Sequence, residues 1–172
     1  MAAKQFAFFT GSIITAADNT LVSADMQTGL QDILALGAGA GLAMQVRKIE
    51  VQLPLIVPAS GLSINQYFYI SRQPETSSPL NLDDRNVIFW EHRSMFNVAV
   101  TAVGVIHSEQ KTFIERHYDP DELLIVESTL RLLAITDDAS QAGGTHFVRI
   151  SGEVIRLSET ERLRVLSSNL SS

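Results

Sequence analysis

The clearest pattern in the chain lies between Leu123 and Leu157, where apolar and polar residues alternate in two extended segments. The apolar positions are Leu124, Val126, Leu130, Leu132, Ala134, Val148, Ile150, Gly152 and Val154. A period of two predicts the strands of a half-buried antiparallel sheet. The polar segment 137–145 between them contains Gly143 and Gly144, so we expect it to turn the chain and join the two strands as a hairpin.

Further stretches rich in aromatic and β-branched residues are typical of strands. They cover residues 6–15, 46–57, 62–71, 87–93 and 96–106. Pro54 falls inside one of them and cannot donate to a strand ladder, so this strand is expected at a sheet edge or with a bulge at the proline.

Two short helices are also predicted. In the first, Ser23 serves as the cap, Gly37 ends the helix, and apolar residues recur at helical spacing: Met26, Leu30, Ile33 and Leu34. In the second, Ser158 and Glu161 form a capping box before a helix at about 159–170. Its apolar positions are Leu163, Leu166 and Leu170.

The remaining segments are irregular and polar or small. They are a glycine- and alanine-rich linker at 37–43, a loop at 72–86 and a connection at 107–122. Loops of this length in compact domains are often functional or contact other subunits. The linker and loop 72–86 are therefore expected to supply subunit contacts.

Seven or eight strands with two short helices predict an all-β fold. Because no strand–helix–strand alternation is present, the sheet is not parallel. An antiparallel β-sandwich, most simply an eight-stranded jelly roll, fits the pattern, and a Greek-key sandwich of another strand order fits it as well. The length predicts a single domain, 1–172.

Composition narrows the chemistry. The chain has no cysteine, which excludes disulfides and thiolate metal sites. Its net charge is −6, and its longest apolar stretches are too short for a transmembrane helix, so an integral membrane protein is not expected. A mean hydropathy of +0.13 is high for a soluble chain and is consistent with surface hidden in an assembly.

No catalytic or cofactor-binding constellation is apparent. The four histidines (His92, His107, His117 and His146) are far apart in sequence, and no serine lies in a nucleophile elbow. Oxygen ligands for calcium at a subunit interface are available from Asp119, Asp121 and Glu122. Acidic residues of this kind more often form turns and remain solvated.

Nucleic-acid binding is disfavoured because phosphate neutralisation needs clustered cations. The only adjacent cationic pair is Arg47-Lys48. Arg131 and Arg149 are expected on neighbouring strands of the hairpin together with two glutamates, Glu127 and Glu153. A face of mixed charge fits a protein partner or solvent better than a polyanion.

The stretches 122–133 and 147–158, with the last strand running directly into a helix at 157–163, give the chain its overall layout. In this layout it resembles viral single jelly-roll capsid proteins, including small coat proteins of environmental viruses. The resemblance implies a non-enzymatic coat subunit of the virion that assembles with copies of itself, and with other capsid proteins, into an icosahedral shell.

Coat proteins that condense single-stranded genomes usually carry a terminal arm rich in Arg and Lys, and Met1–Gln5 contains a single cation. The resemblance therefore argues against direct genome binding. It fits a shell lined by an internal membrane or by another protein, as in tailless phages built from paired small capsid proteins.

Three other functions share this pattern. The first is a trimeric phage decoration, tail-associated or receptor-binding protein. The second is a carbohydrate-binding module, in which sugar rings would stack on Trp90, Tyr67, Tyr69 and Tyr118. The third is a cupin-type enzyme, which would need histidines clustered on adjacent strands.

Overall fold

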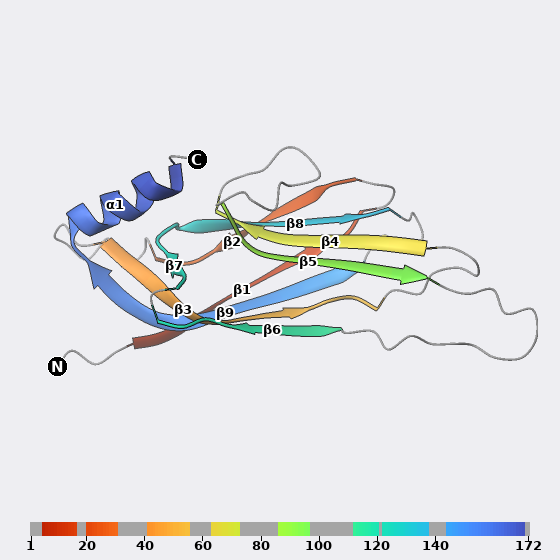
Figure 1. Ribbon diagram of the computed structural model, residues 1–172, viewed down its shortest axis with the longest axis horizontal. Coiled ribbons are helices and arrows are strands. Elements are labelled where there is room, and N and C mark those ends of the chain that lie inside the picture. Colours follow the sequence, from red (N-terminus) through yellow and green to blue (C-terminus); the bar gives the residue numbers. More distant parts are fainter. Residues whose placement is uncertain are drawn as a thin grey trace, which may run out of the picture.

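The computed structural model describes residues 5–16, 20–30, 41–55, 63–72, 86–96, 112–120, 122–137 and 144–170. Within these ranges the chain forms nine strands and one helix (Figure 1). The elements are β1 (Gln5–Ile14), β2 (Val22–Gln27), β3 (Gly41–Gln52), β4 (Ser63–Ser71), β5 (Val87–Phe96), β6 (Phe113–His117), β7 (Leu124–Ile125), β8 (Thr129–Thr136), β9 (Thr145–Leu157) and α1 (Glu159–Leu170).

The strands build two antiparallel sheets that pack face to face. Sheet A has the order β1-β9-β3-β6, with the short β7 also paired to β3, and sheet B has the order β2-β8-β4-β5. Pairing is nested along the chain: β1 pairs with β9, β2 with β8, β3 with β6 and β4 with β5, and these pairs alternate between the sheets. This is the arrangement of a jelly roll, so the predicted all-β antiparallel sandwich is confirmed.

The core lies between the sheets, where the inward side of each alternating strand is apolar. On β8, Leu130, Leu132 and Ala134 are fully buried, as the sequence pattern predicts. The largest fully buried side chains of this core are Met26, Met44, Ile49, Phe68, Phe89, Ile70, Ile125, Leu130 and Leu132.

The predicted hairpin at 123–157 is wrong in its pairing, although both strands exist. β8 belongs to sheet B and pairs with β2 and β4, whereas β9 belongs to sheet A and pairs with β1 and β3. Alternation shows that each strand has one buried face, but both inner faces of a sandwich give the same pattern. Arg131 and Arg149 are consequently on different sheets, not on neighbouring strands.

The predicted helix beginning at Ser23 is also wrong over the described residues. Val22–Gln27 is strand β2, and Ser23 lies opposite Leu133 of β8. Met26 and Leu30 are both buried, but Gly29 between them has a φ of 66°, which interrupts any helix. Met26 and Leu30 are four residues apart, and this spacing places them on one face of either a helix or a strand. Residues 31–40, which include most of the predicted linker, lie outside the described residues.

Strand β3 ends at Gln52, before Pro54, and is not an edge strand because it lies between β9 and β6. Its irregularity in register falls between Val46 and Lys48, away from the proline. The segment predicted as a polar connection, 107–122, contains strand β6. It was missed because only two of its five residues are apolar.

Two expectations fall wholly or partly outside the described residues. Most of the strand expected at 96–106 lies there, and so does loop 72–86 except for its ends. At those ends the Arg72 amide donates to the Asn86 carbonyl oxygen at 2.9 Å, which brings the beginning of β5 beside the end of β4.

Helix α1 begins and ends where the sequence predicts. Ser158 Oγ accepts a hydrogen bond from the Glu161 amide at 3.3 Å, and Glu161 Oε2 accepts one from the Ser158 amide at 2.9 Å, so the capping box is confirmed. Val165 packs on the cluster formed by Ala43, Val126 and Leu157. Leu163 is instead exposed.

No helix within the described ranges combines the length and apolarity that a membrane span needs.

Candidate interaction surface

The outward side of sheet A carries the most distinctive set of side chains in the described part of the chain. Cross-strand register places them in rows that run from β1 across β9 and β3 to β6. The Lys48 row is Phe8, Ser151, Lys48 and His117, and the Glu50 row is Thr10, Arg149, Glu50 and Glu115. The Phe147 row is Ser12, Phe147, Gln52 and Phe113. Phe6 lies beside Glu153 at the opposite end.

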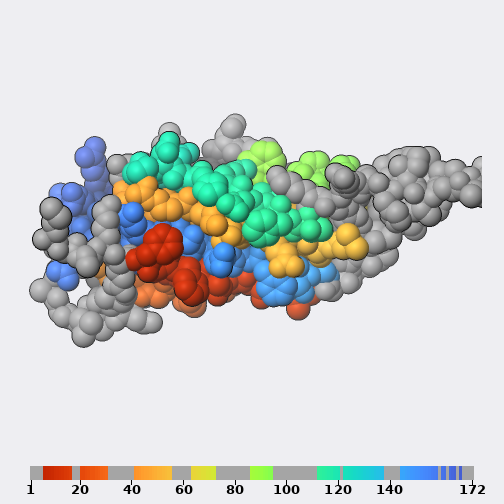
Figure 2. Space-filling model, turned by 90° about the horizontal axis from the view of Figure 1, so that it is seen from below, coloured from red at the N-terminus to blue at the C-terminus, as the bar shows by residue number. Residues whose placement is uncertain are grey.

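We call these residues the sheet A outer face. Figure 2 looks onto this side, with β6, β3, β9 and β1 side by side. Its phenylalanines are unusually accessible: Phe6 is 64% exposed, Phe8 66%, Phe113 49% and Phe147 52%. Exposed aromatic side chains gathered on one face are typical of interaction sites.

A network of charges occupies the middle of the face, between these aromatics. Arg149 donates two hydrogen bonds to Glu50, from Nε to Oε2 at 2.5 Å and from Nη2 to Oε1 at 2.8 Å. Lys48 Nζ lies 3.1 Å from Glu50 and 3.6 Å from Glu115. The two positive charges, of Lys48 and Arg149, therefore equal the two negative charges, of Glu50 and Glu115.

Glu50 is the most buried member of this network. Its side chain is buried beneath Arg149, and the bidentate hydrogen bond lowers the pKa of Glu50 to about 2, against the opposing effect of burial, with a further contribution from Lys48. The carboxylate therefore remains charged over the whole physiological range. It fixes Arg149 and Lys48 in place on the face.

Two shallow hollows flank the Arg149–Glu50 pair, each of about 260 Å³. One is lined by Phe6, Phe8 and Lys48, and the other by Phe113, Phe147 and Gln52, while Arg149 and Glu50 border both. The face thus has both protruding aromatic rings and depressions. A surface of this shape can interdigitate with a complementary protein surface.

The sequence-predicted calcium ligands lie at the end of β6, away from this face. The Glu122 carboxylate accepts a hydrogen bond from the Asp119 amide at 2.9 Å, and the Glu122 amide donates to the Asp119 carbonyl oxygen at 3.2 Å. Asp121 lies outside the described residues. Among the described residues no three His, Asp or Glu side chains gather as metal ligands. A calcium site here stays a prediction.

The three histidines that the structure describes occupy separate places. His92 stacks on Tyr67 on the outward side of sheet B, with ring centroids 4.3 Å apart. His117 is on the sheet A outer face, where its Nε2 lies 2.5 Å from Glu115. His146 is fully buried between the sheets. His107 lies outside the described residues.

Polar side chains also enter the sandwich near Pro54: Gln66, Arg93, Thr136 and His146. Arg93 donates to the Pro54 carbonyl oxygen at 2.9 Å and to Gln66. His146 stacks on Phe68 with ring centroids 5.1 Å apart. Burial and the nearby Arg93 charge lower the pKa of His146 to about 3, so its ring is neutral at neutral pH. We call these four residues the interior polar cluster.

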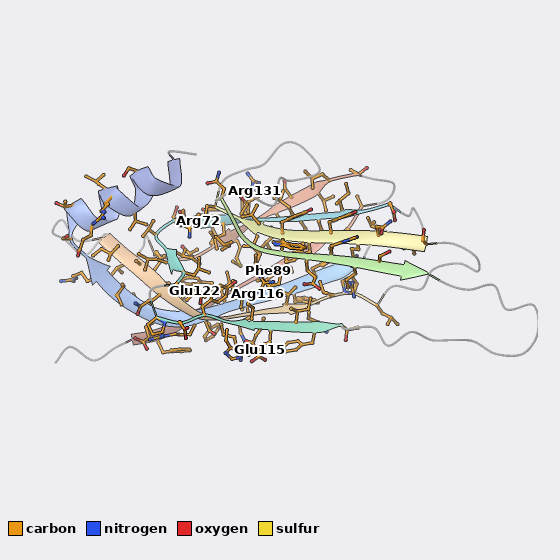
Figure 3. All side chains as sticks on the ribbon, viewed as in Figure 1. Arg72, Phe89, Glu115, Arg116, Glu122 and Arg131 are labelled. Atoms are coloured by element: carbon orange, nitrogen blue, oxygen red, sulfur yellow. The ribbon has the colours of Figure 1, made fainter. Side chains whose placement is uncertain are left out.

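The aromatic residues considered as sugar platforms are divided among different environments. Trp90 is 39% exposed on sheet B, whereas Tyr69, its cross-strand neighbour, is buried. The Tyr118 hydroxyl donates to the Ile88 carbonyl oxygen at 3.3 Å. Nearby, Arg116 of β6 lies over the Phe89 ring of β5, 4.8 Å from its centroid, and links the two sheets (Figure 3).

Two arginines on or next to sheet B are paired with carboxylates. Arg131 Nη1 lies 3.0 Å from Asp25, and Arg72 Nη1 lies 3.4 Å from Glu127 (Figure 3). Arg72 also donates to the Leu124 carbonyl oxygen at 3.0 Å. These pairings leave sheet B, like sheet A, with a mixed-charge surface.

Sequence reasoning missed the sheet A outer face as a unit. The alternation of β1 and β9 placed Phe6, Phe8 and Phe147 on one side of their strands, which was the available signal. Their convergence with Phe113 depends on β6, which was not predicted, and on pairing between strands about 100 to 140 residues apart in sequence.

Comparisons with known proteins give distant matches among solved structures only. No family model and no curated protein matches this sequence. Among solved structures, a chain from Desmodium yellow mottle tymovirus matches with a TM-score of 0.36 and 13% sequence identity, covering 92% of this chain and 89% of that one. This TM-score is too low to assign a function, so function has to be inferred from the surface of the chain itself.

Proposed function

We propose that this chain is a self-assembling capsid subunit, many copies of which form a closed icosahedral shell. The observation that carries the proposal is the sheet A outer face. On this face, four phenylalanines that are about half exposed or more surround a network of equal positive and negative charges. Apolar surface of this kind is stabilised when a partner covers it.

The charge balance of the face supports a protein as the partner. A nucleic acid or an anionic membrane would select an excess of cations. Here Lys48 and Arg149 are matched by Glu50 and Glu115, and at the end of the face Arg47 Nη2 lies 3.1 Å from Glu153. Aromatic residues and arginine are the residue types enriched in protein–protein interfaces.

The body of the molecule supports the same function. A two-layer sandwich whose core is filled by closely packed apolar side chains resists deformation. Its two ends and edges present separate surfaces, so one subunit can contact several neighbours. Repeated contacts of this kind generate closed symmetric assemblies.

Purification of the full chain followed by light scattering and negative-stain electron microscopy tests the proposal. We expect closed particles of uniform size. We also expect their ratio of absorbance at 260 and 280 nm to be that of protein alone, because the proposed shell assembles without binding nucleic acid. A monodisperse monomer at every concentration examined would refute the proposal.

A further inference from the structure

We propose that two copies of this chain pack through their sheet A outer faces about a two-fold axis that runs across the strands, between the Lys48 row and the Glu50 row. This pairing rests on the proposed function, because it names one of the contacts from which the shell is built. A two-fold contact requires a self-complementary surface. The register of the face meets that requirement.

The complementarity follows from the order of the rows. For two faces related by this axis, the Lys48 row of one copy lies opposite the Glu50 row of the other. On β3, Lys48 then meets the partner's Glu50. On β6, His117 meets the partner's Glu115. Each of these contacts occurs twice, so the charges of the two copies interlock without an excess of either sign.

The same operation matches the aromatic ends of the face. The end that carries Phe6 lies opposite the end that carries the partner's Phe147 row. Phe6 is on β1 and Phe147 on the adjacent β9. Because neighbouring strands are about 4.8 Å apart, the two rings come side by side. Each ring is then aimed at the hollow that the partner's aromatics border.

The size of the face is compatible with a stable contact. From Phe6 to Ile14 it extends about 26 Å along the strands, and its four strands are about 19 Å wide, which gives about 500 Å² in projection. Protruding rings and hollows raise the true contact area above this projection. A standard interface buries about 800 Å² per partner.

A two-fold axis along the strands would give a different set of contacts. It would place β6 of each copy opposite β1 of the other. Glu115 would then face Thr10 and His117 would face Phe8, and neither would meet an opposite charge across the interface. The residues of β6 therefore distinguish the two arrangements.

Two charge variants on β6 provide the decisive experiment. Glu115→Lys makes this column of the face basic, and His117→Glu makes it acidic. Both side chains are accessible, at 37% and 72% exposure, so neither change disturbs the core. Across the proposed axis, two copies of the Glu115→Lys variant place each introduced lysine opposite the partner's His117. Two copies of the His117→Glu variant place each introduced glutamate opposite the partner's Glu115. In a mixed dimer the lysine introduced into one copy faces the glutamate introduced into the other.

We expect each variant alone to associate about tenfold more weakly than the natural chain in sedimentation equilibrium, and an equimolar mixture to recover most of the loss. A mixture that associates no better than its components would overturn the crosswise pairing. Recovery cannot arise from contacts within one chain, because each copy keeps its own substitution.

An aromatic substitution supplies the second arm. Phe6→Ser removes a ring from the face, whereas Leu163→Ser removes a side chain of similar exposure from α1. We expect only Phe6→Ser to weaken association. If particles form and both β6 variants and Phe6→Ser assemble like the natural chain, the pairing is wrong while the capsid function stands. If the natural chain forms no assembly, both proposals fall.

Discussion

At the scale of single residues, the tightest constraint is at Gly152 on β9. A Cβ at this position would collide with the carbonyl oxygen of Gln45 and lie 3.0 Å from the Val46 Cα. Both belong to β3, beside the irregularity in its register. The close approach of two backbones therefore requires glycine here.

Gly152→Ala is expected to destabilise the fold by at least about 2 kcal/mol, since backbone atoms must move to admit the methyl group. Gly11→Ala is the matched control. Its Cβ would meet the flexible Met26 side chain at 2.8 Å, which can shift. Urea unfolding of both variants measures the difference. Equal stabilities for the two would contradict this account of β3 and β9.

His146 makes the stability of the fold depend on pH. Its pKa in the folded state is about 3, lowered from 6.5 mainly by burial and also by the Arg93 charge, with a small opposing effect from the backbone of Ile13. The unfolded chain therefore binds a proton on His146 that the folded chain excludes. Stability is retained above pH 6.5 and falls as the pH drops toward 3.

Between pH 6.5 and about 4.5 we expect the free energy of unfolding to fall by about 1.4 kcal/mol per pH unit from this residue. This window lies above the range in which Glu50, with its pKa of about 2, is protonated. In His146→Gln the loss should be much smaller. Urea midpoints at several pH values measure it, and parallel curves for the two proteins would show that His146 is not responsible.

At the scale of elements, α1 is held at its beginning by a capping box and along its length by the contact of Val165. Among the described residues of the helix, Val165 contacts the small cluster at Leu157 and Leu163 faces outward. The hydrogen bonds between Ser158 and Glu161 also lower the pKa of Glu161, because they favour the charged carboxylate.

Ser158→Ala is expected to weaken α1 by about 1 kcal/mol. The amides of the first helical turn should then exchange faster with deuterium, while those of β3 and β9 stay unchanged. Ser167→Ala is the control, because Ser167 Oγ donates to the Arg164 carbonyl oxygen within the helix and caps no terminus. Equal exchange in the two variants would contradict the role of the box.

The elements that the sequence predicted correctly are those with a sustained pattern. β1, β3, β4, β5, β8 and β9 are each at least eight residues long, and α1 has a complete cap. The sequence predicts a helix at β2 because this strand is only six residues long, and the spacing of its Met26 from Leu30 fits the period of a helix as well as that of a strand. β6 was missed because Ile114 is its only buried apolar residue. Short elements are defined by the sheet that receives them, and local sequence does not contain that information.

At the scale of the whole molecule, the fold class was predictable and the pairing was not. Alternation requires that each strand bury one face, which leads to a two-layer sandwich whichever partners the strands choose. The surface was less predictable still. Arg149 and Glu50 are 99 positions apart, and only the completed β3–β9 ladder brings them together.

The position of β9 at the interior of sheet A has a consequence for synthesis in the cell. Its neighbours β1 and β3 leave the ribosome long before it does, and the partner of Phe8 is Ser151. Until β9 emerges, the rows of the sheet A outer face lack the strand that joins β1 to β3. Under the proposed pairing, a nascent subunit therefore cannot dock onto a finished copy before β9 has been synthesised.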